Sequence, residues 1–163
     1  MLGFLTDNEI DSLLMSQAIG RVGCHSGGKT IVVPITYAFD GKRIIGNTTA
    51  GEKIAFMRAN PSVCLEVDQV KDLRNWRSVI VQGRYRELKG EDASLAMSYL
   101  VRAVKPHLPS ETMMPGHGGA SIRPRSHLGE SDTIVFCLDI LEKTGRFELW
   151  EEPPGMSSIP STR

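Results

Sequence analysis

The stretch KTIVVPITYAFDGKRIIGN, residues 29–47, alternates apolar and other side chains before and after a turn signal. One face of its first half is formed by five residues, Ile31, Val33, Ile35, Tyr37 and Phe39. This two-residue period is typical of a strand with one buried face. Asp40-Gly41 then gives a strong signal for a hairpin turn. The stretch therefore predicts a pair of antiparallel strands.

Pro34 lies in the middle of the first predicted strand, where proline is unusual. Proline has no backbone N–H and cannot donate a hydrogen bond to a neighbouring strand. We therefore expect Pro34 to lie at a sheet edge, at a bulge or at a gap in strand pairing.

Similar patterns extend in both directions from this hairpin. Apolar residues at helical spacing predict helices over residues 5–18 and 90–108, the first with a capping box of Thr6 and Glu9. Further strands are predicted over 62–70 and 75–88, with one or two more over 132–150. Gly83 in the second of these indicates a bulge or a close backbone approach.

These elements predict a mainly β fold, a small β-barrel with peripheral helices, in one domain of residues 1–150. Residues 109–131 are rich in Gly, Pro, Ser and His and show no periodicity, so a long loop is expected there. Residues 151–163 are expected to form a flexible tail.

Composition excludes several classes of function. The 163 residues carry 19 basic and 19 acidic side chains, so a nucleic-acid partner is not expected. No apolar run reaches the roughly 18 residues that cross a membrane, and no signal pattern begins the chain. The three widely spaced cysteines indicate free thiols in the cytoplasm, with neither disulfides nor a metal site.

The stretch GNTTAGEKIAFMRANP, residues 46–61, has two interpretations. Thr48 and Thr49 precede a short predicted helix that carries Lys53 in its first turn. A threonine could simply cap the helix. Alternatively, free N–H groups, the helix dipole, two hydroxyls and an ammonium could bind an anion.

No pattern of catalytic side chains stands out. The four histidines lack metal-ligand spacing, and no GxSxG or Cys–His signature is present. The catalytic residues therefore stay unknown, and any chemistry could be supplied by a cofactor.

Four segments, in this order, resemble the FMN-binding split-barrel family of pyridoxamine 5'-phosphate oxidase, especially its nitroimidazole-reductase-like branch. They are GRVGCHSGGKTIVVPITYAFDGKRI (20–44), GNTTAGEKIAFMRANPSVCLEV (46–67), WRSVIVQGRYREL (76–88) and LEKTGRFE (141–148). The resemblance implies a homodimer with FMN at the subunit interface and oxidoreductase activity on a small molecule. The alternative is a non-catalytic carrier or sensor of flavin, deazaflavin or haem on the same fold.

The resemblance also implies roles for individual residues. Lys53, with Asn47, Thr48 and Thr49, would hold the cofactor phosphate. The flavin ring and ribityl chain would lie along the strand of Val33, Pro34, Ile35, Thr36 and Tyr37. Further contacts would come from Arg77, Ser78, Arg146 and Trp150, the last two from the same or the other subunit. The loop Pro109–Ser131 would cover the cofactor or the partner.

Two positions depart from the family pattern. Glu52 precedes Lys53 where the family usually has an arginine as a second phosphate ligand, and Arg77 is a candidate to replace that charge. Gly46 lies near a position where nitroimidazole reductases often carry a histidine.

Overall fold

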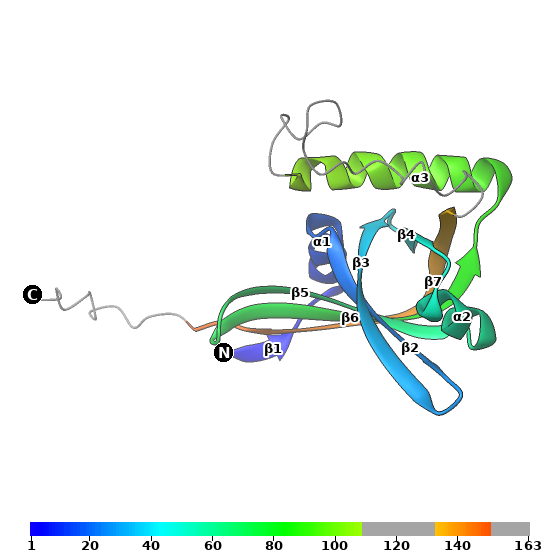
Figure 1. The fold of residues 1–163 in the computed structure, drawn as a ribbon. Coiled ribbons are helices and arrows are strands. Elements are labelled where there is room, and N and C mark those ends of the chain that lie inside the picture. The colour runs from blue at the N-terminus through cyan, green and yellow to red at the C-terminus, as the bar shows by residue number, and fades with distance from the viewer. Residues whose placement is uncertain (109–132, 151–163) are drawn as a thin grey trace, which may run out of the picture.

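The computed structural model describes residues 1–108 and 133–150. Seven strands form one antiparallel sheet in the order β1-β7-β4-β3-β2-β5-β6, and β6 also pairs with β7, so that six strands close a barrel (Figure 1). The strands are β1 (Leu2–Phe4), β2 (Ile19–Ser26), β3 (Lys29–Phe39), β4 (Arg43–Thr49), β5 (Ser62–Asp72), β6 (Asn75–Glu87) and β7 (Thr133–Glu148). The mainly β prediction is confirmed.

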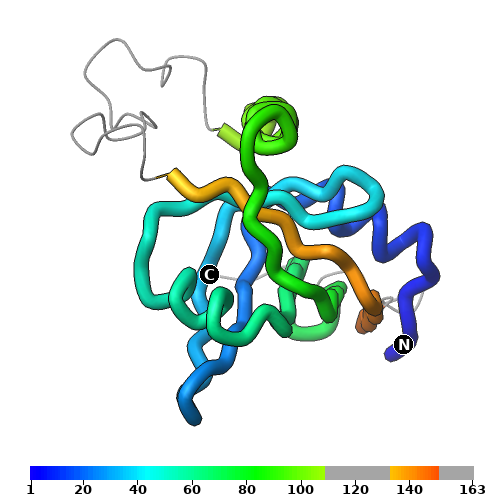
Figure 2. Tube along the Cα trace, turned by 90° about the vertical axis from the view of Figure 1, so that its right-hand side faces the viewer, coloured from blue at the N-terminus to red at the C-terminus, as the bar shows by residue number. Residues whose placement is uncertain are grey.

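Three helices surround this barrel: α1 (Asp7–Ser16), α2 (Glu52–Ala59) and α3 (Gly90–Val104), the last followed by a 3₁₀ turn, η1 (Lys105–His107). Figure 1 shows α3 running across the outside of the barrel, and Figure 2 shows the same helix end-on. There it packs against a cluster that includes Ala38, Ile45 and Cys137. The predicted loop over 109–131 and the tail over 151–163 lie outside the described residues.

The predicted hairpin is confirmed, with Phe39 opposite Ile44. Asp40 closes its turn, because its carboxylate accepts hydrogen bonds from the backbone N–H groups of Lys42 and Arg43. Gly41 has a φ of 91°, which a residue with a side chain rarely adopts. The turn chemistry at these two residues thus fixes the register of β3 on β4.

Helix α1 closes one end of the barrel. Its predicted capping box of Thr6 and Glu9 is present, and its apolar face is almost fully buried through Ile10, Leu13 and Leu14. The hydroxyl of Tyr37 donates to the backbone oxygen of Leu14 at 2.8 Å, which ties the helix to β3. The inward face of β3 therefore belongs to the barrel core.

Within the predicted segment 132–150, residues Thr133–Glu148 form one strand, β7, which pairs with β4 and with β6. A change of register opposite Gln82 and Gly83 leaves Leu141 as an extra residue in β7. Gly83 also lies close to β7, because a Cβ there would be 3.2 Å from the backbone oxygen of Asp139. Both expectations for Gly83 are confirmed, and the bulge lets one strand bend around the barrel.

Burial of Tyr37 predicts a loss of stability at high pH. Burial raises the pKa of its hydroxyl above the usual value of about 10. Above about pH 10 the unfolded chain therefore loses this proton while the folded chain retains it, so unfolding becomes more favourable as pH rises. Tyr37→Phe should flatten this decline, although it costs about 1 kcal/mol at neutral pH by removing the bond to Leu14. Urea unfolding at about pH 8 and about pH 11 measures both effects. An equal loss of unfolding free energy between these two pH values in wild type and Tyr37→Phe would contradict this assignment.

Candidate functional site

The candidate cofactor site begins at a split between β3 and β4. Their pairing ends at Tyr37 opposite Gly46. Residues 29–36 of β3 then pair only with β2, and residues 47–49 of β4 pair only with β7, among the strands that the structure describes. The two strands therefore separate within the segments that sequence analysis assigned to the ring and the phosphate.

Pro34 faces this split. The backbone N–H of Tyr37 donates to the oxygen of Ala18, which makes these two residues a hydrogen-bonded pair of the β2–β3 ladder. Hydrogen-bonded and non-hydrogen-bonded pairs alternate along antiparallel strands, so Pro34 and Arg21 form a non-hydrogen-bonded pair. The nitrogen of Pro34 thus points away from β2, toward the edge where pairing with β4 has ended. The prediction of a break in pairing at Pro34 is confirmed.

The start of α2 lies next to this split and is not capped by a threonine. Gly51 is the N-cap, no side chain caps the helix, and the Thr48 hydroxyl donates to the oxygen of Thr49. The capping interpretation of these threonines is therefore wrong. The first helical hydrogen bond joins the N–H of Ala55 to the oxygen of Gly51, so the three N–H groups before it have no acceptor within the helix.

The charges around this helix start differ from the expectation. Glu52, the acidic departure from the family pattern, forms an ion pair with Lys29 at the start of β3. Lys29 also lies 5.8 Å above the centre of the Phe56 ring. Lys53 is half-buried and forms no ion pair among the described residues. Two ammonium groups against one carboxylate leave this end of α2 positive.

Sequence analysis missed Lys29. It lies 23 residues before Glu52, and no local spacing links the two. The only available signal was the two-glycine turn before it. Gly27 and Gly28 have φ values of 56° and 77°, which suit a tight hairpin and bring the start of β3 back beside α2.

The residues of β3 contribute to the split in different ways. The side chains of Ile35 and Tyr37 are buried in the barrel core, so only their backbone can contact a ligand. Pro34 and Thr36 are exposed on the outer face, and Val33 is half-buried against the core. This agrees with a ring that contacts mainly backbone groups of the strand.

The remaining predicted residues lie elsewhere in the chain. Ser78 and Arg146 are cross-strand neighbours on the outer face of β6 and β7, where Ser78 donates to Glu66 and Arg146 lies over the Phe4 ring. Arg77 points to the opposite face, since successive side chains of a strand alternate. The structure therefore does not bring Arg77 together with its neighbour Ser78.

A long distance also separates these residues from Lys53. Arg58 of α2 forms an ion pair with Glu87 at the end of β6, whereas Ser78 lies near its beginning. At about 3.3 Å per residue, the nine intervening steps span roughly 30 Å. Figure 1 shows the β5–β6 turn and α2 on opposite sides of the molecule. Within one chain, Arg77 therefore cannot replace the charge lost at Glu52.

Gly46 has a packing role. It is buried, and a Cβ at this position would lie 2.6 Å from the ring of Phe136. We expect Gly46→Ala to destabilise the protein by about 1–3 kcal/mol, because the ring must move. The double variant with Phe136→Leu should lose less unfolding free energy than the sum of the losses of the two single variants. Urea unfolding measures this coupling, and Thr49→Ala on the same strand is the control; strict additivity would contradict the proposed clash.

The chain also resembles known proteins in sequence. Residues 6–117 match the family model described as pyridoxamine 5'-phosphate oxidase. An uncharacterised protein of Rhizobium meliloti (strain 1021), RA0666, is 31% identical over 145 residues, which cover 87% of this chain and 92% of the relative. The chain belongs to the pyridoxamine 5'-phosphate oxidase family.

Solved structures agree with this family assignment. A protein from Mesorhizobium loti, described as FAD-binding, has 26% identity and a TM-score of 0.72, with 92% of this chain and 98% of that chain covered. A protein from Bacteroides thetaiotaomicron, whose description names 5-nitroimidazole antibiotic resistance, has 16% identity and a TM-score of 0.66, with 90% and 87% covered. A heme binding protein from Mycobacterium smegmatis has 14% identity and a TM-score of 0.62, with 82% and 50% covered. The predicted family and its split-barrel fold are confirmed.

Residues 1–108 and 133–150 lack two other features. No helix there is long and apolar enough to span a membrane. No group of three or more His, Cys, Asp or Glu side chains in these ranges is placed to hold a metal ion. Of the three cysteines, Cys24 and Cys137 are buried free thiols and Cys64 is half-buried.

Proposed function

We propose that this member of the pyridoxamine 5'-phosphate oxidase family is an FMN-binding flavoprotein, an oxidoreductase that acts on a small molecule in the cytoplasm. The positive start of α2 beside the β3–β4 split carries this proposal. A helix N-terminus with an adjacent ammonium is a favourable site for a phosphate. The solved relative described as FAD-binding supports a flavin. We propose FMN because one helix start with Lys53 suits one terminal phosphate.

The protein's own groups would hold and orient this cofactor. Lys53 and the free N–H groups of α2 would bind the phosphate, with Asn47, Thr48 and Thr49 at the end of β4 as further donors. The backbone of residues 33–37 would lie beside the ring. A bound flavin supplies the electron-transfer chemistry. We assign no residue as a general acid or base.

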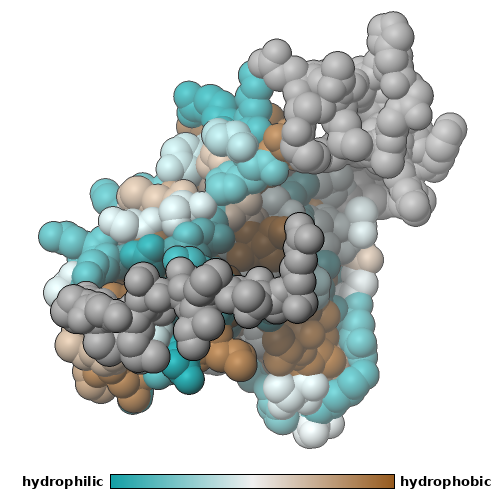
Figure 3. Space-filling view, turned by 90° about the vertical axis from the view of Figure 1, so that its left-hand side faces the viewer, coloured by the Kyte–Doolittle hydropathy of each residue, from teal (hydrophilic) through white to brown (hydrophobic). Residues whose placement is uncertain are grey.

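We further propose that the site is completed by a second copy of the chain. The predicted cofactor residues form two groups, one around Lys53 beside the end of β6 and one around Ser78 and Arg146 near its beginning. A twofold dimer would bring the first group of one copy to the second group of the other. Apolar surface is exposed on the face of the molecule shown in Figure 3. On the outer barrel face, Ile19, Val32 and Leu141 are between 63% and 74% exposed.

The rival function is a non-catalytic carrier or sensor of flavin, deazaflavin or haem. One observation favours it over a nitroimidazole reductase. Gly46 is buried beneath Phe136, so this chain has no acid–base side chain where such reductases often carry a histidine. A carrier would need only binding and orientation.

An absorbance spectrum of the purified protein tests the cofactor class, because flavin, deazaflavin and haem absorb at different wavelengths. Titration of the apoprotein with FMN, FAD and riboflavin then tests the phosphate site, with FMN expected to bind most tightly. Light scattering should give about twice the monomer mass. Turnover of an acceptor by the reduced holoprotein favours the enzyme, whereas reduction without turnover favours the carrier. A haem spectrum, or a monomer that retains flavin, would contradict the corresponding part of the proposal.

A further inference from the structure

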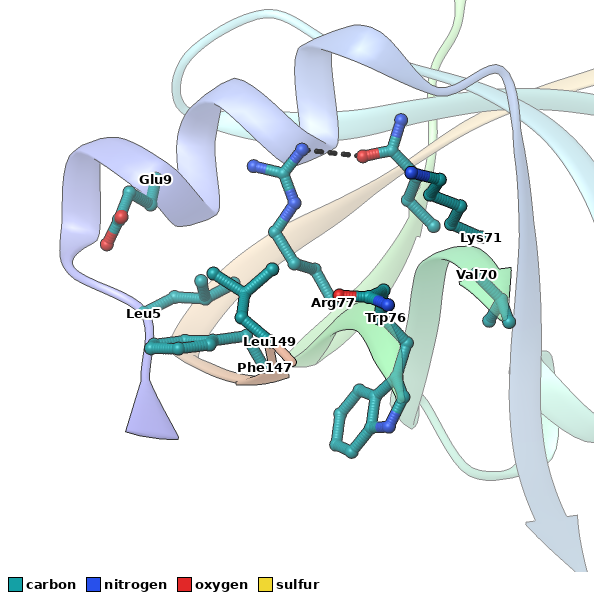
Figure 4. Close-up of a pocket in the computed structure, with 10 residues that line it drawn as sticks. Leu5, Glu9, Val70, Lys71, Trp76, Arg77, Phe147 and Leu149 are labelled. Carbon is teal, nitrogen blue, oxygen red and sulfur yellow. Dashed lines mark hydrogen bonds between the residues drawn. The ribbon is translucent and has the colours of Figure 1, made fainter. Parts of the chain in front are cut away.

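A second cleft lies beneath α1, at the end of the barrel away from Lys53 (Figure 4). Its volume is about 590 Å³, within the range of small-molecule sites. Three apolar side chains, Leu5, Phe147 and Leu149, line one part of it. Three charged side chains also line the cleft, with Arg77 between Glu9 on one side and Lys71 on the other (Figure 4). The cleft thus combines an apolar surface with charges that could orient a ligand.

Arg77 is the main polar group of this cleft. Figure 4 shows its guanidinium group rising toward α1, whereas the indole of the adjacent Trp76 points to the other side of the sheet. Nη2 of Arg77 donates to Oε1 of Gln69 at 2.6 Å. Arg77 is not among the described arginines that form ion pairs, and it shares this with Arg84 of the same strand. Arg77 has no carboxylate partner in the described ranges and retains donors for a ligand.

The charge balance of the cleft limits the ligand. Lys71 is a second cation without an ion pair among the described residues. Glu9 provides the opposing carboxylate, and its Oε2 accepts two 2.8 Å hydrogen bonds from the backbone and the hydroxyl of Thr6. The backbone hydrogen bond from Thr6 is the main reason why the pKa of Glu9 lies below its usual range. Because the cleft has two cations and one fixed carboxylate, it favours a ligand with one negative charge over a ligand with two.

We propose that this cleft binds a flat aromatic monoanion, an aryl carboxylate of one or two rings. The planar fork of Arg77 matches a carboxylate with two parallel hydrogen bonds. The ring of Phe147 and the side chains of Leu5 and Leu149 provide apolar contact for the aryl group. Each chain builds this cleft from its own residues, so the site is independent of the proposed flavin site.

Titration with 2-naphthoate tests the proposal. Calorimetry measures the affinity, and NMR of the side-chain amides locates the bound ligand. The neutral isostere 2-naphthalenemethanol should bind at least about tenfold more weakly, because it cannot form the charged pair. Arg77→Met should weaken naphthoate about ten- to a hundredfold and leave the alcohol unchanged. Arg77→Lys should fall between the wild type and Arg77→Met. Amide signals of Gln69 and Asn75 should shift, while those of Gln82, far along β6, should not.

Arg84→Met is the matched control, since Arg84 is an exposed arginine of the same strand outside the cleft. It should leave naphthoate binding unchanged, and thermal unfolding should show that each variant is folded. The measurements are made with and without FMN and should agree. Three outcomes would overturn the proposal. They are the absence of naphthoate binding, an equal loss of naphthoate affinity in Arg77→Met and Arg84→Met, and competition between naphthoate and FMN. Failure of the protein to bind flavin would leave the expected naphthoate results unchanged.

Discussion

Replacing Lys53 with alanine is expected to raise the dissociation constant for FMN about ten- to a hundredfold while leaving that for riboflavin nearly unchanged. Lys53 lies in the first turn of α2, where free N–H groups and the helix dipole already favour an anion. A phosphate is close to doubly charged, so its contact with an ammonium is a charge-assisted bond of about 1.5–3 kcal/mol. Riboflavin has no phosphate and should therefore not respond. Fluorescence titration of both ligands measures the difference.

Lysines elsewhere in the chain sharpen this test. Lys42→Ala, in the exposed β3–β4 turn, is the neutral control. Lys29→Ala should also weaken FMN binding, because it leaves the carboxylate of Glu52 without its partner beside the phosphate. In a Glu52→Gln background, Lys29→Ala should weaken FMN binding less, because residue 52 then carries no negative charge for Lys29 to neutralise. An equal loss of FMN and riboflavin in Lys53→Ala would mean that this residue supports the fold and not the phosphate.

The parts of the fold that could be predicted were those with a local cause. The hairpin at Asp40-Gly41 and the capping box at Thr6 depend on neighbouring residues and local backbone geometry. Pro34 predicted a break in pairing, because a residue without an N–H cannot donate a hydrogen bond to a neighbouring strand. The three-residue strand β1 was not predicted, because it is too short to show a period and is held by its pairing with β7.

The candidate site was less predictable, because its geometry depends on long-range register. The resemblance marked Lys53, Ser78 and Arg146, but no local pattern could show that β6 carries Ser78 far from α2. Arg77 and Ser78 are adjacent in sequence and lie on opposite faces, which follows once residue 77 is placed on a strand. The ion pair of Lys29 with Glu52 likewise requires the fold before it can be seen.

Replacing Val32 with glutamate is expected to convert the proposed dimer into a monomer that binds neither FMN nor riboflavin. Val32 lies on the outer face of β3 and lines a hollow of about 480 Å³ with Gly23, Cys64 and Leu141. The lining of this hollow also includes the polar residues His25, Thr30, Ser62 and Gln82. A carboxylate that becomes buried in an interface costs about 3–5 kcal/mol per copy where it finds no ionic partner. A twofold interface contains the residue twice, so the dimer dissociation constant should rise at least about ten-thousandfold. Light scattering across a dilution series measures this.

Leu95→Glu is the matched control, because Leu95 has a similar exposure but lies on α3, away from the outer face of β3. It should leave both the dimer and flavin binding intact. Val32→Glu should remain folded, since its side chain is already exposed in the single chain. Lys53→Ala should lose only the phosphate contact, whereas Val32→Glu should remove the second half of the proposed site. A Val32→Glu protein that stays dimeric would place the interface elsewhere, and a monomeric variant with full FMN affinity would show that one chain holds the cofactor alone.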